Sequence, residues 1–294
     1  MPKKNKKGNL QYEHLKKVWS KRHKELQKEI FEKHKDSLDW ISQNSKQFAV
    51  GSLAGLFLLT SPIVPKIPTA FSSASAEVNK LIDKKIFLVY DLKNILPNEV
   101  RPLTPQEEVN VSEVLSRTFD LRVVPELEGK RLNTSYGLIG QEQHLARYPG
   151  DNMLAHFDNP EDAQKYFKYG MAPGLGAWGY INNTKDSTLE KATEREKYYI
   201  AVQTFLAPGF SQNPKEYTDF FRYIKMLVVN PQNGKAMVVV IGDAGPAQWT
   251  GKSLGGSPEV MTFLERYDGR QRGPVLYFFI DDPDDKIPLG PISL

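Results

Sequence analysis

Short apolar runs separated by glycine, proline and asparagine dominate the chain from Leu132 onward. Each run is about the length of one strand and is rich in β-branched or aromatic residues, a texture typical of all-β domains. The pattern predicts a mainly β domain, either a small barrel or a sandwich. Its clearest expected strands are 198–206, 223–230, 235–241 and 274–281.

Turn and cap signals separate these strands. The middle two are joined by 231–234 (PQNG), where Asn-Gly supplies the positive φ angles of a tight hairpin. At 257–259 (SPE), an N-cap, a proline and an acid in the first turn predict a short helix. A second helix is expected at 160–167, opened by Asp158 or Asn159.

A stretch of 19 residues without charge lies between Lys46 and Lys66. A membrane-spanning helix needs about 20 mostly apolar residues, so we expect residues 48–65 to be an uncleaved signal anchor. The small residues 74–76 (ASA) also fit a signal-peptidase motif, and cleavage after Ala76 is the second interpretation. A buried core helix is the third, and the linker-like flanks disfavour it.

Residues 1–47 form a basic segment with 13 Lys and Arg against 6 Asp and Glu. Leu15, Trp19 and Ile30 recur among lysines at roughly helical spacing, which fits either an amphipathic helix on an anionic inner leaflet or a solvated tail. Positive charge before the span places the N-terminus in the cytoplasm and the C-terminal domain outside the cell membrane.

The rest of the chain divides into three parts. Prolines and serines follow the span, so we expect 66–125 to be a linker or stalk, within which 85–92 (KIFLVYDL) fits either a strand or the start of a helix. The β domain is expected at 126–284, and 285–294 is expected to be a tail.

Charge and composition exclude several kinds of site. Outside 1–47 the chain has 26 basic against 29 acidic residues, which argues against nucleic acid as a partner. The absence of cysteine excludes thiol nucleophiles, zinc fingers and iron–sulfur clusters. The histidines at 14, 23, 34, 144 and 156 have no metal-ligand spacing, and no glycine loop fits a nucleotide. We therefore expect no metal, no cofactor and no nucleotide.

An ordered series of motifs runs through 228–258. A strand ends in Asn230, an Asn-Gly hairpin follows, a second strand runs into 243–246 (DAGP), and a helix is led by Ser257. In order and spacing this series resembles the second half of double-psi β-barrels of the rare lipoprotein A group, with expansins and membrane-bound lytic transglycosylase A as wider relatives. The resemblance covers 228–282 and implies a six-stranded double-psi β-barrel with insertions at 140–170 and 182–195.

The resemblance also implies that peptidoglycan or a related glycan binds in an open groove across the barrel. In the lytic members, one Asp near the Asp-x-Gly-Pro position protonates the glycosidic oxygen, and that position here is Asp243. Two departures weaken the catalytic interpretation: Ala244 replaces the usual Arg, and 254–257 lacks the second Asp that commonly precedes the Ser. Without the resemblance, an Asp that caps its own turn is the simpler interpretation.

A polar loop at 140–151 supplies further candidates for the groove. Glu142 and His144 can hold Asp243 or a sugar hydroxyl, and Arg147 can receive a peptide carboxylate through two hydrogen bonds. An ordinary polar loop whose histidine is satisfied by the backbone explains the same residues.

Aromatic residues complete the expected substrate-binding set. Trp249 is the preferred platform for a sugar ring because it directly follows the DAGP loop. Trp178 is a second stacking candidate, although it can instead fill the core. Tyr136 lies where the resembled family places its opening strands and loops.

These observations predict a membrane-anchored, extracytoplasmic cell-wall protein that binds peptidoglycan and cleaves it as a lytic transglycosylase, with Asp243 as general acid. Two alternatives remain open. One is a non-catalytic, expansin-like wall-binding module, and the other is a scaffold for a protein partner.

Overall fold

The computed structural model describes residues 84–157, 159–182, 189–266 and 273–294. The basic segment 1–47, the span expected at 48–65 and Ala76 lie outside this part of the chain. Among the described residues, no helix has both the length and the apolar character needed to cross a bilayer. Residues Ala74–Leu294 belong to one compact unit.

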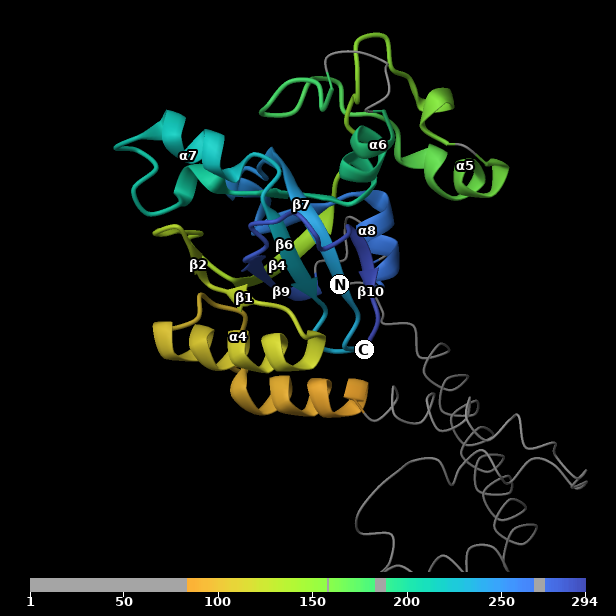
Figure 1. The fold of residues 1–294 in the computed structure, drawn as a ribbon. Coiled ribbons are helices and arrows are strands. Elements are labelled where there is room, and N and C mark those ends of the chain that lie inside the picture. Colours follow the sequence, from red (N-terminus) through yellow and green to blue (C-terminus); the bar gives the residue numbers. More distant parts are fainter. Residues whose placement is uncertain (1–83, 158, 183–188, 267–272) are drawn as a thin grey trace, which may run out of the picture. The chain divides into compact units, whose positions relative to one another are not determined.

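Six strands close into a barrel at the centre of this unit (Figure 1). Around the ring they are β4 (Tyr136–Gln141), β8 (Leu254–Gly256), β5 (Tyr199–Val202), β7 (Ala236–Ala244), β6 (Lys225–Val229) and β9 (Gly273–Ile280). The pairs β4–β8 and β5–β7 are parallel and the other four are antiparallel. Pairing of β9 with both β6 and β4 closes the ring, so the mainly β prediction is confirmed in the form of a barrel.

Short strands extend this framework. Strand β1 (Val123–Val124) pairs with β9, and β10 (Gly290–Ile292) pairs with β7. Strands β2 (Glu126–Leu127) and β3 (Lys130–Arg131) form a separate hairpin. The stretch expected to be a tail, 285–294, therefore includes a strand of the main sheet.

Three expected strands, 223–230, 235–241 and 274–281, are confirmed as β6, β7 and β9. The fourth, 198–206, is shorter than expected, because the chain leaves β5 at Val202 and enters a 3-10 turn, η4 (Thr204–Leu206). The Asn-Gly hairpin between β6 and β7 is also confirmed. Gly234 has φ +70°, and its N–H donates to the Asn230 carbonyl over 2.9 Å.

Both expected short helices form as their caps indicate. Ser257 Oγ accepts the Val260 N–H at the start of α8 (Pro258–Phe263), and Asn159 caps α5 (Pro160–Tyr166). Between β4 and β5, where insertions are expected, lie η2 (Met153–His156), α5, η3 (Phe167–Tyr169) and α6 (Leu189–Lys197). Helix α7 (Pro214–Phe221) precedes β6, and the 3-10 turn η5 (Gln248–Thr250) lies between β7 and β8.

The stretch expected to be a stalk is instead packed on the barrel where it is described. Residues 84–95 are helical, and α4 (Pro105–Phe119) follows them, the two helices lying side by side in Figure 1. Their buried side chains share one apolar cluster with the barrel strands; it includes Leu88, Leu92, Val111, Leu115, Leu227, Val229, Leu276 and Phe278. Burial of these side chains is the physical reason that this stretch is not an extended tether.

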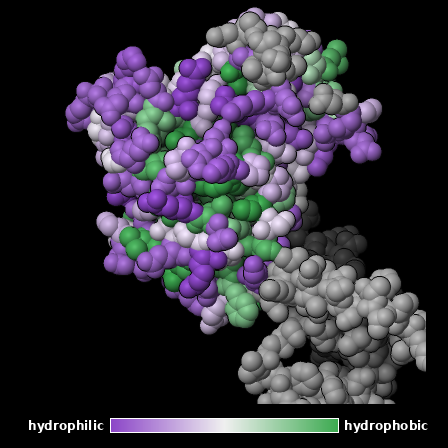
Figure 2. Space-filling view, in the orientation of Figure 1, coloured by the Kyte–Doolittle hydropathy of each residue, from purple (hydrophilic) through white to green (hydrophobic). Residues whose placement is uncertain are grey.

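Strands β6, β7 and β9 are apolar on both faces. Alternate residues fill the inside of the barrel, including Met226, Val228, Val239, Tyr277 and Phe279. The residues between them face the covering helices. Hydrophilic residues cover most of the molecular face in Figure 2, with apolar ones gathered near its centre.

Candidate functional site

Asp243 lies near the end of β7, half-buried against the 174–179 loop. Its Oδ1 accepts the N–H groups of Ala177, at 2.7 Å, and Ala244, at 2.8 Å. A Cβ atom on Gly176 would lie only 3.4 Å from Oδ1, so glycine at this position makes the approach easy. The carboxylate thus caps its own turn, as the simpler interpretation has it, and also ties a second loop to the barrel.

The second oxygen of Asp243 is differently placed. Among the described residues, no hydrogen bond reaches Oδ2. Burial raises the pKa of the carboxyl above its ordinary value, although the two backbone N–H groups act in the opposite direction. Because Oδ1 is held by two donors, a proton on this carboxyl belongs on Oδ2.

Trp249 is presented on the loop that follows Asp243. It lies in η5, and 88% of its surface is exposed. Gln203, which is buried, braces this loop because its Nε2 donates to the carbonyls of Pro246, at 2.9 Å, and Lys252, at 3.3 Å. A large indole is therefore held in solvent on a fixed support.

Glu142 forms an ion pair with Lys252 rather than with Asp243. The Lys252 Nζ lies 2.9 Å from Glu142 Oε1 and also donates to the Gln141 carbonyl at 3.2 Å. Two glycines make room for this pair: a Cβ on Gly140 would lie 2.2 Å from Lys252 Cδ, and one on Gly255 would lie 2.1 Å from Glu142 Oε1.

Two aromatic candidates lie in the core instead of on the surface. Tyr136 is buried in the apolar cluster beneath the covering helices. Trp178 is partly buried against the inner cluster, and its Nε1 donates to the Thr218 carbonyl at 3.0 Å. Burial leaves the ring of Tyr136 no face for a sugar, and Trp178 fills the core as its alternative interpretation has it.

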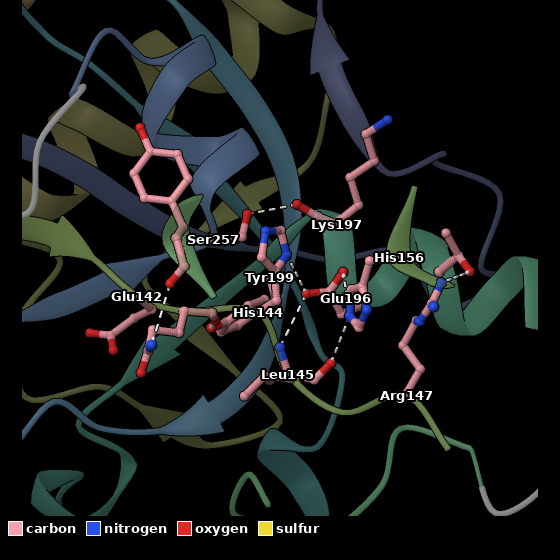
Figure 3. Close-up of polar contacts among 12 residues, drawn as sticks. Glu142, His144, Leu145, Arg147, His156, Glu196, Lys197, Tyr199 and Ser257 are labelled. Carbon is pink, nitrogen blue, oxygen red and sulfur yellow. Dashed lines mark hydrogen bonds and ion pairs between the residues drawn. The ribbon is translucent and has the colours of Figure 1, made fainter. Parts of the chain in front are cut away.

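Arg147 is also buried and fully engaged (Figure 3). Its guanidinium makes two 2.9 Å hydrogen bonds to the Asp151 carboxylate and a third, of 2.6 Å, to the Ala155 carbonyl. The expected role of receiving a peptide carboxylate is therefore filled by Asp151 of the same loop.

His144 lies in a buried polar cluster that sequence inspection missed (Figure 3). Its Nδ1 is 3.0 Å from Glu196 Oε1, which also accepts the Leu145 N–H at 3.1 Å. His156 is the third member, with its Nε2 3.8 Å from Glu196 Oε2. The three side chains are at most 4% exposed, so His144 does not line an open groove.

Glu259, the acid expected in the first turn of α8, is buried. Burial and the charge of Glu196 raise its pKa to about 7, against the opposing effect of His144. Helix α6 supplies Glu196 and the β4–β5 connection supplies both histidines. This cluster is hard to recognise from sequence because its members are far apart in the chain: 52 residues separate His144 from Glu196, and 11 separate His156 from Leu145. The only sequence signal is the density of polar residues at 140–151.

A cavity of about 350 Å³ opens beside α6, lined by residues that include Glu190, Arg195, Tyr223, Lys225 and Leu289. None of the expected site residues lines it. It is therefore separate from the Asp243 end of β7.

Comparison of the chain with protein-family models, curated proteins and solved structures finds no match in any of the three.

Proposed function

We propose that this protein binds a cell-wall glycan such as peptidoglycan at the end of the barrel that carries Asp243, and cleaves it as a lytic transglycosylase. The observation that carries the proposal is the carboxyl of Asp243, whose Oδ1 accepts two backbone N–H groups while Oδ2 has no hydrogen-bond partner among the residues that the structure describes. A closed six-stranded barrel is compatible with the double-psi topology of the rare lipoprotein A group.

The chemistry needs one acid. The raised pKa of Asp243 favours the protonated form that a general acid requires. Oδ2–H donates its proton to the glycosidic oxygen as the bond from that oxygen to the anomeric carbon breaks. A hydroxyl of the same sugar then bonds to the anomeric carbon, and its proton returns to Asp243. The reaction therefore requires no second carboxylate.

Trp249 supplies the binding surface in this proposal. The apolar face of a pyranose packs on an exposed ring, and the indole stands in solvent on the loop that Gln203 braces. Glu142 and Lys252, paired at 2.9 Å at the end of β4, are polar groups for sugar hydroxyls. A signal anchor at 48–65 would hold this domain at the outer face of the cell membrane, where the glycan lies.

The decisive experiment measures release of soluble muropeptides from purified sacculi by the full chain and by its D243N variant. Asparagine keeps an oxygen for the two N–H donors but has no acidic proton, so we expect release to fall by about 10²- to 10⁴-fold. The matched control is D219N, which alters an exposed carboxylate paired with Lys215. Equal release by the wild type and D243N would exclude Asp243 as the acid.

Sacculus pull-down separates the alternatives. Binding by the wild type and by D243N, with no release by either, would identify a non-catalytic wall-binding module, to which the replacement of the usual Arg by Ala244 points. We expect W249A to weaken binding in both cases. Absence of sacculus binding by the wild type would overturn the glycan proposal and favour a scaffold for a protein partner.

A further inference from the structure

Three metal-ligating side chains converge inside the protein, apart from the proposed glycan site. His144 and His156 come from the connection after β4, and Glu196 comes from α6. One ligand atom from each lies within 4.8 Å of the others, and all three residues are buried. Two imidazoles and a carboxylate form a set that suits zinc and other divalent transition metals.

The distances can be compared with those of a loaded site. Atoms bound at about 2.1 Å to one tetrahedral Zn²⁺ are about 3.4 Å apart. His144 Nδ1 and Glu196 Oε1 lie 3.0 Å apart, His156 Nε2 and Glu196 Oε2 lie 3.8 Å apart, and one ligand atom from each residue lies within 4.8 Å of the others. The three side chains must therefore approach one another by up to about 1.4 Å to bind one tetrahedral ion.

The surroundings of His156 allow it to act as a ligand through Nε2. Its Nδ1 lies 3.1 Å from the Asn152 carbonyl, and an N–H there can donate to that carbonyl, as ligating histidines commonly do. Nε2 lies 3.2 Å from the Leu145 carbonyl and 3.8 Å from Glu196 Oε2. A cation bound to Nε2 would replace the N–H that otherwise donates to the Leu145 carbonyl.

Unpartnered polar atoms point the same way. Among the described residues, His144 Nε2 and Glu259 Oε2 are buried without a hydrogen-bond partner. Buried polar atoms are rarely left so, and a missing ion is one recognised explanation. One ion can take only one nitrogen of His144, so binding through Nδ1 would leave Nε2 as an N–H that still lacks an acceptor.

We propose that His144, His156 and Glu196 bind one divalent transition-metal ion, with Zn²⁺ as the best match. All three side chains are buried, so the ion has a structural role, and they supply three of the four ligands of a tetrahedral zinc. It ties the loop that follows β4 to α6, two segments inserted between β4 and β5. A metal-free account exists, in which hydrogen bonds to the Asn152 and Leu145 carbonyls hold the His156 ring, with Asp151 3.6 Å and Glu196 3.8 Å away.

Metal content distinguishes the two accounts. The full chain is purified without a histidine tag, stripped with a chelator, incubated with micromolar ZnSO₄, desalted and analysed by elemental mass spectrometry. We expect about one zinc per chain for the wild type, and a visible spectrum of nitrogen- and oxygen-coordinated Co²⁺ when Co²⁺ replaces Zn²⁺. A wild type that retains no metal would overturn the proposal.

Variants locate the ion. We expect E196Q to retain less than about a tenth of the wild-type zinc, whereas E194Q, the same change at an exposed position of the same helix, retains it all. E196Q leaves the histidines at 14, 23 and 34 unchanged, so zinc bound by those residues would still be retained by this variant. Full zinc retention by E196Q would therefore contradict the assignment. Should E196Q fail to fold by circular dichroism, H156Q replaces it. If neither folds, a wild-type Tm that does not rise with Zn²⁺ would equally sink the proposal.

Discussion

At the scale of single residues, some buried charges in this protein are paired within one loop. Arg147 and Asp151 are the clearest case, with side chains 4% and 0% exposed. Burial opposes ionisation of Asp151, but the hydrogen bonds from Arg147 outweigh it and hold the pKa of Asp151 below its ordinary value. Both groups are therefore ionised, and each depends on the other.

Replacing Arg147 with methionine should lower the free energy of unfolding by about 3–5 kcal/mol, because the buried Asp151 carboxylate loses its partner. Urea unfolding at pH 7 measures the change. The control is R117M, since Arg117 is 74% exposed on α4 and its loss should cost no more than about 0.5 kcal/mol. A fully stable R147M variant would contradict the structural role and reopen a ligand-binding one.

At the scale of elements, the loop from β9 to β10 is fastened by one side chain. Asp282 accepts the N–H groups of Lys286 and Ile287, both at 2.9 Å, and Lys225 Nζ of β6 lies 2.7 Å away. Burial acts to raise the pKa of Asp282, but these hydrogen bonds, with that of Lys225 foremost, bring it below the ordinary value of 3.8.

This pairing predicts a pH-dependent contribution to stability. A carboxyl whose pKa is lower in the folded protein stabilises it fully above the unfolded pKa, and that stabilisation is lost as pH falls through the folded pKa. D282N should therefore be less stable than the wild type at pH 7, and the difference should shrink below about pH 4. Thermal melts from pH 7 to pH 2 measure it.

The control for this prediction is D284N, which changes an exposed residue of the same loop, 66% exposed beside Lys286. Its Tm should follow the wild type at every pH. A D282N deficit that is the same at pH 7 and pH 2 would show that lost packing, rather than lost charge, is responsible.

At this scale, local signals predicted several of the elements that carry them. The Asn-Gly hairpin and the capped helices α5 and α8 follow from a few adjacent residues. Helix α7 carries a similar signal, Asn213 followed by Pro214 and an acid at Glu216, and was nevertheless missed. Helix α6 (LEKATEREK) offers almost no apolar stripe to detect, because its buried face is built around Glu196 and Ala192.

The candidate sites differ in the same way. Asp243 was found because its neighbours in the chain carry a resemblance, and its structural surroundings are consistent with the role assigned. The pairing of His144 with Glu196 could not be found, because it depends on how two inserted segments fold against each other. Arg147 was assigned to a ligand because sequence alone does not show that Asp151, four residues later, accepts two hydrogen bonds from its guanidinium.

At the scale of the whole molecule, the composition of the strands reveals a layer that was overlooked. Strands of a barrel with one solvated face alternate apolar and polar residues, whereas continuous apolar runs require cover on both faces. Strands β6 (KMLVV) and β9 (GPVLYFFI) are such runs. The cover is helix 84–95 together with α4, from the stretch interpreted as a stalk.

This layer makes the barrel dependent on the residues that precede it. Helix α4 is also joined to the barrel by Glu108, a buried carboxylate that accepts the Ser135 hydroxyl at 2.7 Å and pairs with Arg131. A chain that begins at residue 126 would lack both helices and expose the outer apolar residues of β6 and β9. Five large side chains of these strands would lose their burial, namely Leu227, Val229, Leu276, Phe278 and Ile280. At about 1.5–3 kcal/mol each, their loss is comparable with the roughly 5–15 kcal/mol by which folded domains are usually stable.

A fragment of residues 126–294 should therefore be insoluble or bind a hydrophobic dye without a cooperative thermal transition, whereas residues 74–294 should melt cooperatively. Gel filtration and circular dichroism of the two fragments, expressed side by side, measure this. Cooperative folding of 126–294 would mean that the helices are dispensable and that the barrel alone defines the domain. The outcome also decides which fragment is suitable for glycan-binding assays. An unfolded barrel would fail to bind glycan whether or not Asp243 takes part in binding.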